Sequence, residues 1–190
     1  MPEYAIGLYG KIPSRGDFVG AGLPVSFVRA WDAWMRRALV ASRAVLGEQW
    51  LPAWLEAPVW RFALPGGACG PEAALGLWMP SVDRVGRHFP LVVGACAASL
   101  SQCPAGFLEA AELAGRAALE RDLDPEAVRM RLAEPVGEPE ALPNFPAAGA
   151  LWWTEGSPRC PKQSFVTEGL PDPVRFAAML DGAAAAAVVS

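Results

Sequence analysis

The sequence has a single histidine, His88, and four cysteines that are too far apart to form a C-x-x-C pair. Zinc sites use compact sets of Cys and His ligands at short spacings. One histidine and these scattered cysteines supply no such set, so we expect no metal and no other cofactor. Because nothing indicates export, we expect the cysteines to be reduced, buried thiols. They are Cys69, Cys96, Cys103 and Cys160.

The chain also lacks a basic N-terminal region followed by an apolar run, and it lacks an apolar stretch of about 20 residues. We therefore expect a cytoplasmic protein with neither a signal peptide nor membrane insertion. Basic charge is scarce as well, because 16 Lys and Arg stand against 20 Asp and Glu, for a net charge of −4. A protein that binds nucleic acid usually carries a basic excess, so no nucleic-acid partner is expected.

Hydrophobic residues are plentiful, at 53% of the 190 residues against 19% charged. A chain of this length and composition is globular and can bury one hydrophobic core without disulfides. Eight Trp and eight Phe supply most of the bulk for that core. We find no internal repeat and no long linker, so the composition predicts a single domain.

Hydrophobic periodicity predicts where helices and strands lie. The clearest helix spans 26–46, with Ser26 as its N-cap and Gly47 as its terminator. Residues 13–22 contain three glycines and are interpreted as loop. The predicted strands are 4–9, 59–64, 74–79, 91–97, 151–154 and 164–167. The other predicted helices are 49–56, 104–123, 125–132 and 173–180, with a proline-rich loop over 134–149.

This order of elements predicts an α/β fold: a single-domain mixed sheet with helices packed on both faces, in a three-layer, sandwich-like arrangement. The strict alternation of a doubly wound fold is absent. The segments 74–79 and 91–97 are apolar throughout, which indicates strands covered on both faces.

The stretch "GKIPSRGDF" at 10–18 invites two functional interpretations that fail. A Walker-type phosphate loop needs G-x-x-x-x-G-K-[ST] leading into a helix, but here Lys11 is followed by Ile12 and Pro13, and Pro13 has no N–H to donate. The tripeptide from Arg15 to Asp17 has the form of an adhesion motif. Adhesion requires an extracellular protein, and no export signal is present.

A second stretch, "MPSVDRVGRHFPL" at 79–91, resembles the first, because each follows a predicted strand and each carries Asp, Arg, Ser and Gly. If the two loops lie side by side, Arg15 or Arg87 can pair with Asp83 or Asp17. Such pairs either fix the loops to the sheet or form a recognition surface on a rigid scaffold. The candidate residues are Ser14, Arg15, Asp17, Asp83, Arg84 and Arg87.

A catalytic interpretation stays open as the alternative. An undetected hydrolase would use Asp17, Asp83 and His88, with Ser14 or Ser81 as the nucleophile. No G-x-S-x-G elbow supports it.

Two adjacent tryptophans, Trp152 and Trp153, form a further candidate feature. Neighbouring residues of a strand face opposite ways, so one ring should enter the core and the other should cover the opposite face or a partner.

Five motifs together resemble the TagF family, accessory proteins of the bacterial type VI secretion system. They occur in family order from about residue 6 to residue 182 and so cover nearly the whole chain. The matching segments are "YGKIPSRGDFV", "PVWRFAL" with "CGP", "MPSVDRVGRHFPL", "LWWTEGSP" and "GLPDPVRFAAMLDG". The resemblance implies one TagF-like domain over 1–190, with an ordered core at about 4–182, and a mixed α/β sandwich.

The resemblance also implies a function. TagF proteins are cytoplasmic, post-translational negative regulators and are not known as enzymes. They restrain assembly through a forkhead-associated scaffold protein, in parallel with a threonine phosphorylation branch. Some members are fused to a PP2C-type phosphatase; nothing in this chain resembles one, so such a phosphatase would act in trans. A structural part of the secretion apparatus is the remaining alternative. The family has no catalytic residues to transfer, and only the motif positions of the two loops carry over, Phe18, Gly16 and Gly86 included.

Overall fold

Seven antiparallel strands form one sheet in the computed structural model, which describes residues 4–121, 123–132, 145–146 and 148–188. The order of strands across the sheet is β2-β1-β5-β4-β3-β6-β7. The strands are β1 (Tyr4–Gly10), β2 (Val19–Ala21), β3 (Trp60–Leu64), β4 (Ala73–Met79), β5 (Leu91–Ala97), β6 (Ala150–Thr154) and β7 (Gln163–Thr167).

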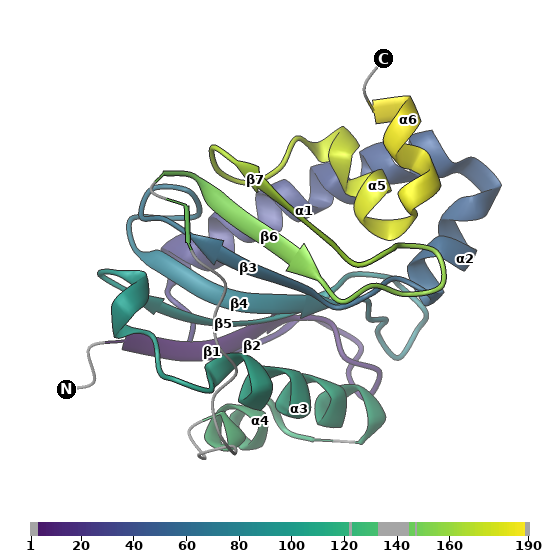
Figure 1. The fold of residues 1–190 in the computed structure, drawn as a ribbon. Coiled ribbons are helices and arrows are strands. Elements are labelled where there is room, and N and C mark those ends of the chain that lie inside the picture. The colour runs from purple at the N-terminus through teal and green to yellow at the C-terminus, as the bar shows by residue number, and fades with distance from the viewer. Residues whose placement is uncertain (1–3, 122, 133–144, 147, 189–190) are drawn as a thin grey trace.

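Helices cover both faces of the sheet, as the order of elements predicted (Figure 1). One face packs against α1, α2 and the C-terminal α5, and the other packs against α3 and α4. The α/β class with helices on both faces is therefore confirmed. The helices are α1 (Val25–Leu46), α2 (Trp50–Leu55), α3 (Phe107–Glu120), α4 (Pro125–Arg131), α5 (Phe176–Leu180) and α6 (Ala185–Val188), with short 3-10 turns at η1 (Gly47–Gln49), η2 (Leu100–Gln102), η3 (Pro173–Arg175) and η4 (Gly182–Ala184).

Large aromatic side chains fill the core under α1. Trp31 lies 5.2 Å from Phe62, and Trp34 lies 5.7 Å from Trp152, measured between ring centroids. All four residues are buried, and fully burying a side chain of this size stabilises the fold by about 2–3 kcal/mol. The opposite face packs smaller Leu, Val and Ala side chains against α3 and α4. The central strands β4 and β5 are buried at every residue, which confirms that they are covered on both faces.

Helix α1 begins one residue earlier than predicted, and its N-terminus is built differently. Pro24 occupies the N-cap position, and no side chain caps the helix. Ser26 lies inside the first turn, so the prediction that it is the cap was wrong. The predicted end is confirmed: Gly47 has φ of 52° and its N–H donates to the carbonyl of Arg43. That left-handed φ favours glycine at this position.

Two fold predictions need correction. The expected mixed sheet is antiparallel at every described pair of strands. Four of the six pairs join strands that are consecutive in sequence, such as β3 with β4, and their connections are too short for a parallel crossover. The segment 13–22 is not all loop, because β2 pairs with β1 through Gly10↔Val19, Tyr9↔Gly20 and Leu8↔Ala21. The proline-rich loop predicted over 134–149 lies largely outside the described residues.

Candidate functional site formed by two loops

A buried ion pair joins the first loop (residues 11–18) to the second loop (residues 80–90). The Lys11 Nζ donates to Asp83 Oδ2 over 2.7 Å, and the two side chains are 7% and 0% exposed. The loops lie together because β1 and β5 are adjacent in the sheet, with Tyr9 opposite Val92. The two loops therefore lie side by side, which is the condition for the pairing considered from the sequence. Lys11 is not among the residues predicted to pair, because its only sequence signal was a phosphate loop that its neighbours exclude.

The Asp83 carboxylate is fully occupied by hydrogen bonds. Its Oδ1 accepts from the backbone N–H groups of Val85 and Arg87 at 3.0 and 2.9 Å. Its Oδ2 accepts from Lys11 and from Arg87 Nε, each at 2.7 Å. Burial alone raises the pKa of Asp83, but these donors lower it by more, so the net pKa lies well below its ordinary range. Asp83 is therefore ionised and has no lone pair left for a substrate.

Three further contacts fix the loops to one another. Ser81 Oγ donates to the carbonyl of Lys11 over 2.7 Å, and the N–H of Arg84 donates to the carbonyl of Arg15 over 2.8 Å. The Arg87 guanidinium donates to the carbonyl of Gly16. The second loop turns back at Gly86, whose φ of 87° suits a residue without a side chain. These contacts support the loop-fixing role for Asp83 and Arg87.

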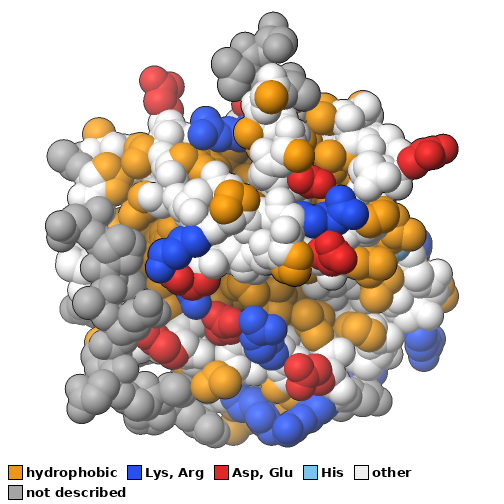
Figure 2. Space-filling model, turned by 45° about the vertical axis from the view of Figure 1, so that its right-hand side comes forward, with side chains coloured by type: hydrophobic (Ala, Val, Ile, Leu, Met, Phe, Trp, Pro, Cys, Tyr) orange, Lys and Arg blue, Asp and Glu red, His pale blue; other side chains and the backbone are white. Residues whose placement is uncertain are grey.

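The outer side chains of the two loops remain in solvent. Asp17 is fully exposed, and its carboxylate lies 3.8 Å from the half-exposed guanidinium of Arg87. Arg15 does not pair with either loop aspartate; it lies 3.6 Å from Asp124 at the start of α4. Arg84 is exposed and forms no described ion pair. Figure 2 shows basic and acidic side chains interspersed over one face of the molecule, with hydrophobic side chains between them.

An aromatic group supports the base of the first loop. Phe18 stacks on Tyr9 with a centroid separation of 5.5 Å and meets Phe89 edge-on at 4.8 Å. The ammonium group of Lys11 lies 5.1 Å from the centre of the Phe18 ring. The hydroxyl of Ser14 is buried and has no hydrogen-bond partner among the described residues. The Ser14 hydroxyl therefore faces inward, while the residue as a whole is half-buried.

The groups of the hydrolase alternative do not meet in one catalytic arrangement. Asp17 projects into solvent, whereas Asp83 is buried and saturated. His88 packs edge-on against both rings of the stacked pair Trp50 and Trp54, at centroid distances of 5.5 and 6.1 Å. Burial, and then the charge of nearby Arg43, lower the pKa of His88.

Ser81 and His88 do line one shallow pocket of about 180 Å³. The Ser81 hydroxyl donates its proton to the Lys11 carbonyl instead of to the imidazole. The serine and the histidine therefore do not form the nucleophile–base pair that the alternative requires.

The cysteines offer no reactive thiol. All four are free; Cys69, Cys96 and Cys160 are buried, and Cys103 is half-buried. Burial raises the pKa of Cys69 and Cys96 to about 12 and that of Cys103 to about 11. A thiol with such a pKa is not a thiolate near neutral pH and is a poor nucleophile and metal ligand. Over residues 4–121, 123–132, 145–146 and 148–188, no group of three or more His, Cys, Asp or Glu is placed to hold a metal.

The two adjacent tryptophans lie on β6 and face opposite sides of the sheet, as predicted. Trp152 enters the aromatic core, and its indole N–H donates to Thr167 Oγ1 over 3.1 Å. Trp153 is half-buried on the other face, opposite Arg61 in the register. Neither tryptophan is part of the two loops, so they form a separate feature.

Among the helices that the structure describes, none combines the length and the hydropathy that a membrane span requires.

The geometry defines a class of protein: an α/β domain whose candidate site consists of two charged loops that a buried ion pair holds together. The chain belongs to the TagF family, because the family model for the TagF N-terminal domain, described as type VI secretion system-associated, matches residues 7–134. This is therefore a type VI secretion system-associated protein.

A solved structure extends the likeness beyond the region matched by the family model. The chain is similar to PA0076 from Pseudomonas aeruginosa PAO1, with 35% sequence identity and a TM-score of 0.79. The match covers 93% of this chain and 94% of that chain. No curated protein matches the sequence. The likeness to PA0076 thus includes the C-terminal strands and helices.

Proposed function

We propose that this chain is a non-enzymatic, cytoplasmic regulator that restrains type VI secretion after translation, by binding another protein of the system. Membership of the TagF family supports the link to secretion. The observation that carries the binding role is the buried Lys11–Asp83 pair, which holds the two loops in one arrangement. A surface that is already ordered loses little conformational entropy on binding, so preorganised loops suit recognition.

The partner we propose is the forkhead-associated scaffold protein that the family resemblance implies. Three exposed charges are its candidate contacts: Asp17, Arg84 and Arg87. A PP2C-type phosphatase acting in trans is a second candidate partner. Charged groups at the rim of an interface mainly set association rate and specificity. Reversing one of them should therefore weaken binding without unfolding the chain.

The test is binding of the purified scaffold protein from the same genome to wild type, Arg84→Glu and Asp17→Arg. A matched control is Lys162→Glu, which reverses an exposed charge just before β7, at the far edge of the sheet from β1. We expect Arg84→Glu and Asp17→Arg to weaken binding about tenfold or more, and Lys162→Glu to leave it unchanged. Equal binding by all four folded proteins would show that the loops are not part of the interface.

A second measurement tests the regulatory role in the bacterium. Deleting the gene should increase secretion through the type VI system, and the wild-type chain should restore repression where Arg84→Glu does not. Reduced secretion on deletion, together with stoichiometric recovery of the chain in the assembled apparatus, would favour a structural component instead.

A further inference from the structure

Strand β7 forms one edge of the sheet, and its outer side pairs with no strand among the described residues. It is five residues long and contains neither proline nor charge. Natural edge strands usually carry such residues, or are very short, because a bare edge attracts another strand. The opposite edge strand, β2, has only three residues. The longer edge of this sheet is therefore the one left open.

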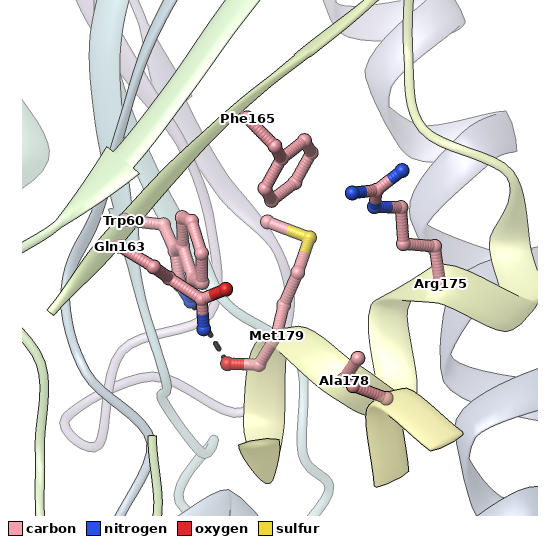
Figure 3. A pocket seen from close by; sticks show the side chains of 7 residues that line it. Trp60, Gln163, Phe165, Arg175, Ala178 and Met179 are labelled. Carbon is pink, nitrogen blue, oxygen red and sulfur yellow. Dashed lines mark hydrogen bonds between the residues drawn. The ribbon is translucent and has the colours of Figure 1, made fainter. Parts of the chain in front are cut away.

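A cavity of about 230 Å³ lies beside this open edge, between β7 and the C-terminal helices (Figure 3). Gln163 and Phe165 line it together, because alternate residues of a strand face the same side. Trp60 and Met179 supply apolar walls from β3 and α5. The cavity is below the usual size of a small-molecule site and suits one large side chain.

Arg175 lines this cavity and has no carboxylate partner among the described residues. The guanidinium of Arg175 lies 4.2 Å from the centre of the Phe165 ring, and the side chain is exposed. Figure 3 shows Arg175 and Phe165 approaching the same hollow from η3 and from β7. No ion pair involving Arg175 occurs within the described part of the chain. A ligand carboxylate placed over the cavity would find an ordered cationic partner.

The other face of β7 also offers apolar surface. Val166 is 51% exposed, and Ser164 borders a shallow hollow that Leu151 and Trp153 line from β6. A strand added beside β7 would therefore meet the exposed Val166 on one face and the cavity with Arg175 on the other.

We propose that β7 binds an extended, acidic segment of a partner protein by strand addition. Main-chain hydrogen bonds to β7 supply affinity, and pockets for alternate side chains supply specificity. An apolar side chain of the segment fills the cavity, and an Asp or Glu two residues away meets Arg175, because residues i and i+2 of a strand share a face about 7 Å apart. The residue between them lies beside Val166 on the opposite face. This surface is distinct from the two loops.

Synthetic heptapeptides test the proposal directly. The probes are acetylated, amidated Thr-Val-Leu-Val-Glu-Val-Thr and two relatives with Phe or Trp in place of Leu; each has a counterpart with Lys in place of Glu. We expect at least one Glu peptide to bind with Kd below about 1 mM and to shift the backbone amide NMR signals of 163–167. Its Lys counterpart should bind at least tenfold more weakly.

Charge reversal supplies the control. Arg175→Glu should invert the preference, so that the Lys peptide binds better than the Glu peptide. Arg84→Glu, in the two-loop site, should change neither affinity, and this separates failure here from failure of the proposed function. Absence of binding by all three Glu peptides, or the same preference in Arg175→Glu, would overturn the proposal. Concentration-dependent self-association blocked by Val166→Pro would assign the edge to a second copy of the chain instead.

Discussion

The Lys11 ammonium and the Asp83 carboxylate, 72 residues apart in sequence, meet at 2.7 Å beneath the surface of the two loops. Both side chains are almost excluded from solvent; Lys11 forms no other ion pair among the described residues, whereas Asp83 also accepts from Arg87. The pair holds the backbones of the two loops in one arrangement, and the exposed charges of the loops therefore keep defined positions.

Replacing Lys11 with methionine is expected to destabilise the fold by about 3 kcal/mol, because it leaves the buried Asp83 carboxylate without its ammonium partner. Lys162→Met is the matched control: Lys162 pairs with Glu155 at 2.6 Å, but its side chain is 73% exposed, and such pairs contribute about 1 kcal/mol or less. Urea unfolding measures both. Equal losses in the two variants would contradict a special role for the buried pair.

Acidification is expected to remove the contribution of Asp83. Burial raises its pKa, but hydrogen bonds from Lys11 and Arg87 bring the net value well below the ordinary 3.8. The unfolded chain thus takes up this proton at a higher pH than the folded chain, so the stability of the fold decreases as the pH decreases. The stability difference between wild type and Asp83→Asn should be full at neutral pH and shrink below about pH 5. Urea unfolding across this range checks it; a constant difference would refute it.

His88 is expected to titrate below its ordinary pKa of 6.5, because burial and then the charge of Arg43 disfavour the imidazolium. As the only histidine in the sequence, it gives unambiguous NMR signals in an untagged chain. Its titration midpoint should lie below 6.5, and Arg43→Gln should raise it. The unfolded chain binds this proton first as pH falls, so His88 also destabilises the fold below about pH 6.5. A midpoint at or above 6.5 would be inconsistent with the packing of His88 against Trp50 and Trp54.

Two glycines should respond very differently to alanine. A Cβ at Gly7 would lie 1.9 Å from the carbonyl oxygen of Ala21, a backbone atom of β2 that cannot move without disturbing the pairing of β2 with β1. A Cβ at Gly115 in α3 would meet the flexible end of Met79 at 2.7 Å. We expect Gly7→Ala to cost about 3 kcal/mol and Gly115→Ala to change stability by about 1 kcal/mol or less, since alanine favours helix. Thermal unfolding of both proteins compares them, and similar melting temperatures would be the contrary result.

Several elements could be predicted because their signals are local. The apolar stripe that includes Trp31 and Trp34 identified α1, and the glycine at 47 identified its end. Alternation placed Trp152 and Trp153 on opposite faces. The charged residues of the loops after β1 and β4 identified these loops as one candidate site.

Other features could not be predicted, because their partners are distant in sequence. β2 has weak strand signals, including Gly20, and exists because the edge of β1 offers hydrogen bonds. Of the two arginines predicted as alternative partners for the loop aspartates, Arg87 pairs with Asp83, whereas Arg15 lies near Asp124, the N-cap of a helix whose position depends on packing.

By itself, the sequence determined the α/β class, most of the helices and strands, and the two charged loops, because each follows from periodicity, turn residues and composition within short windows. The tertiary structure alone decided which charges are buried and which are free. Lys11 became the partner of Asp83, while Arg84 and Arg175 stayed without a described carboxylate. Such outcomes depend on strand order and on exclusion of water, and neither is contained in the local pattern around any one residue.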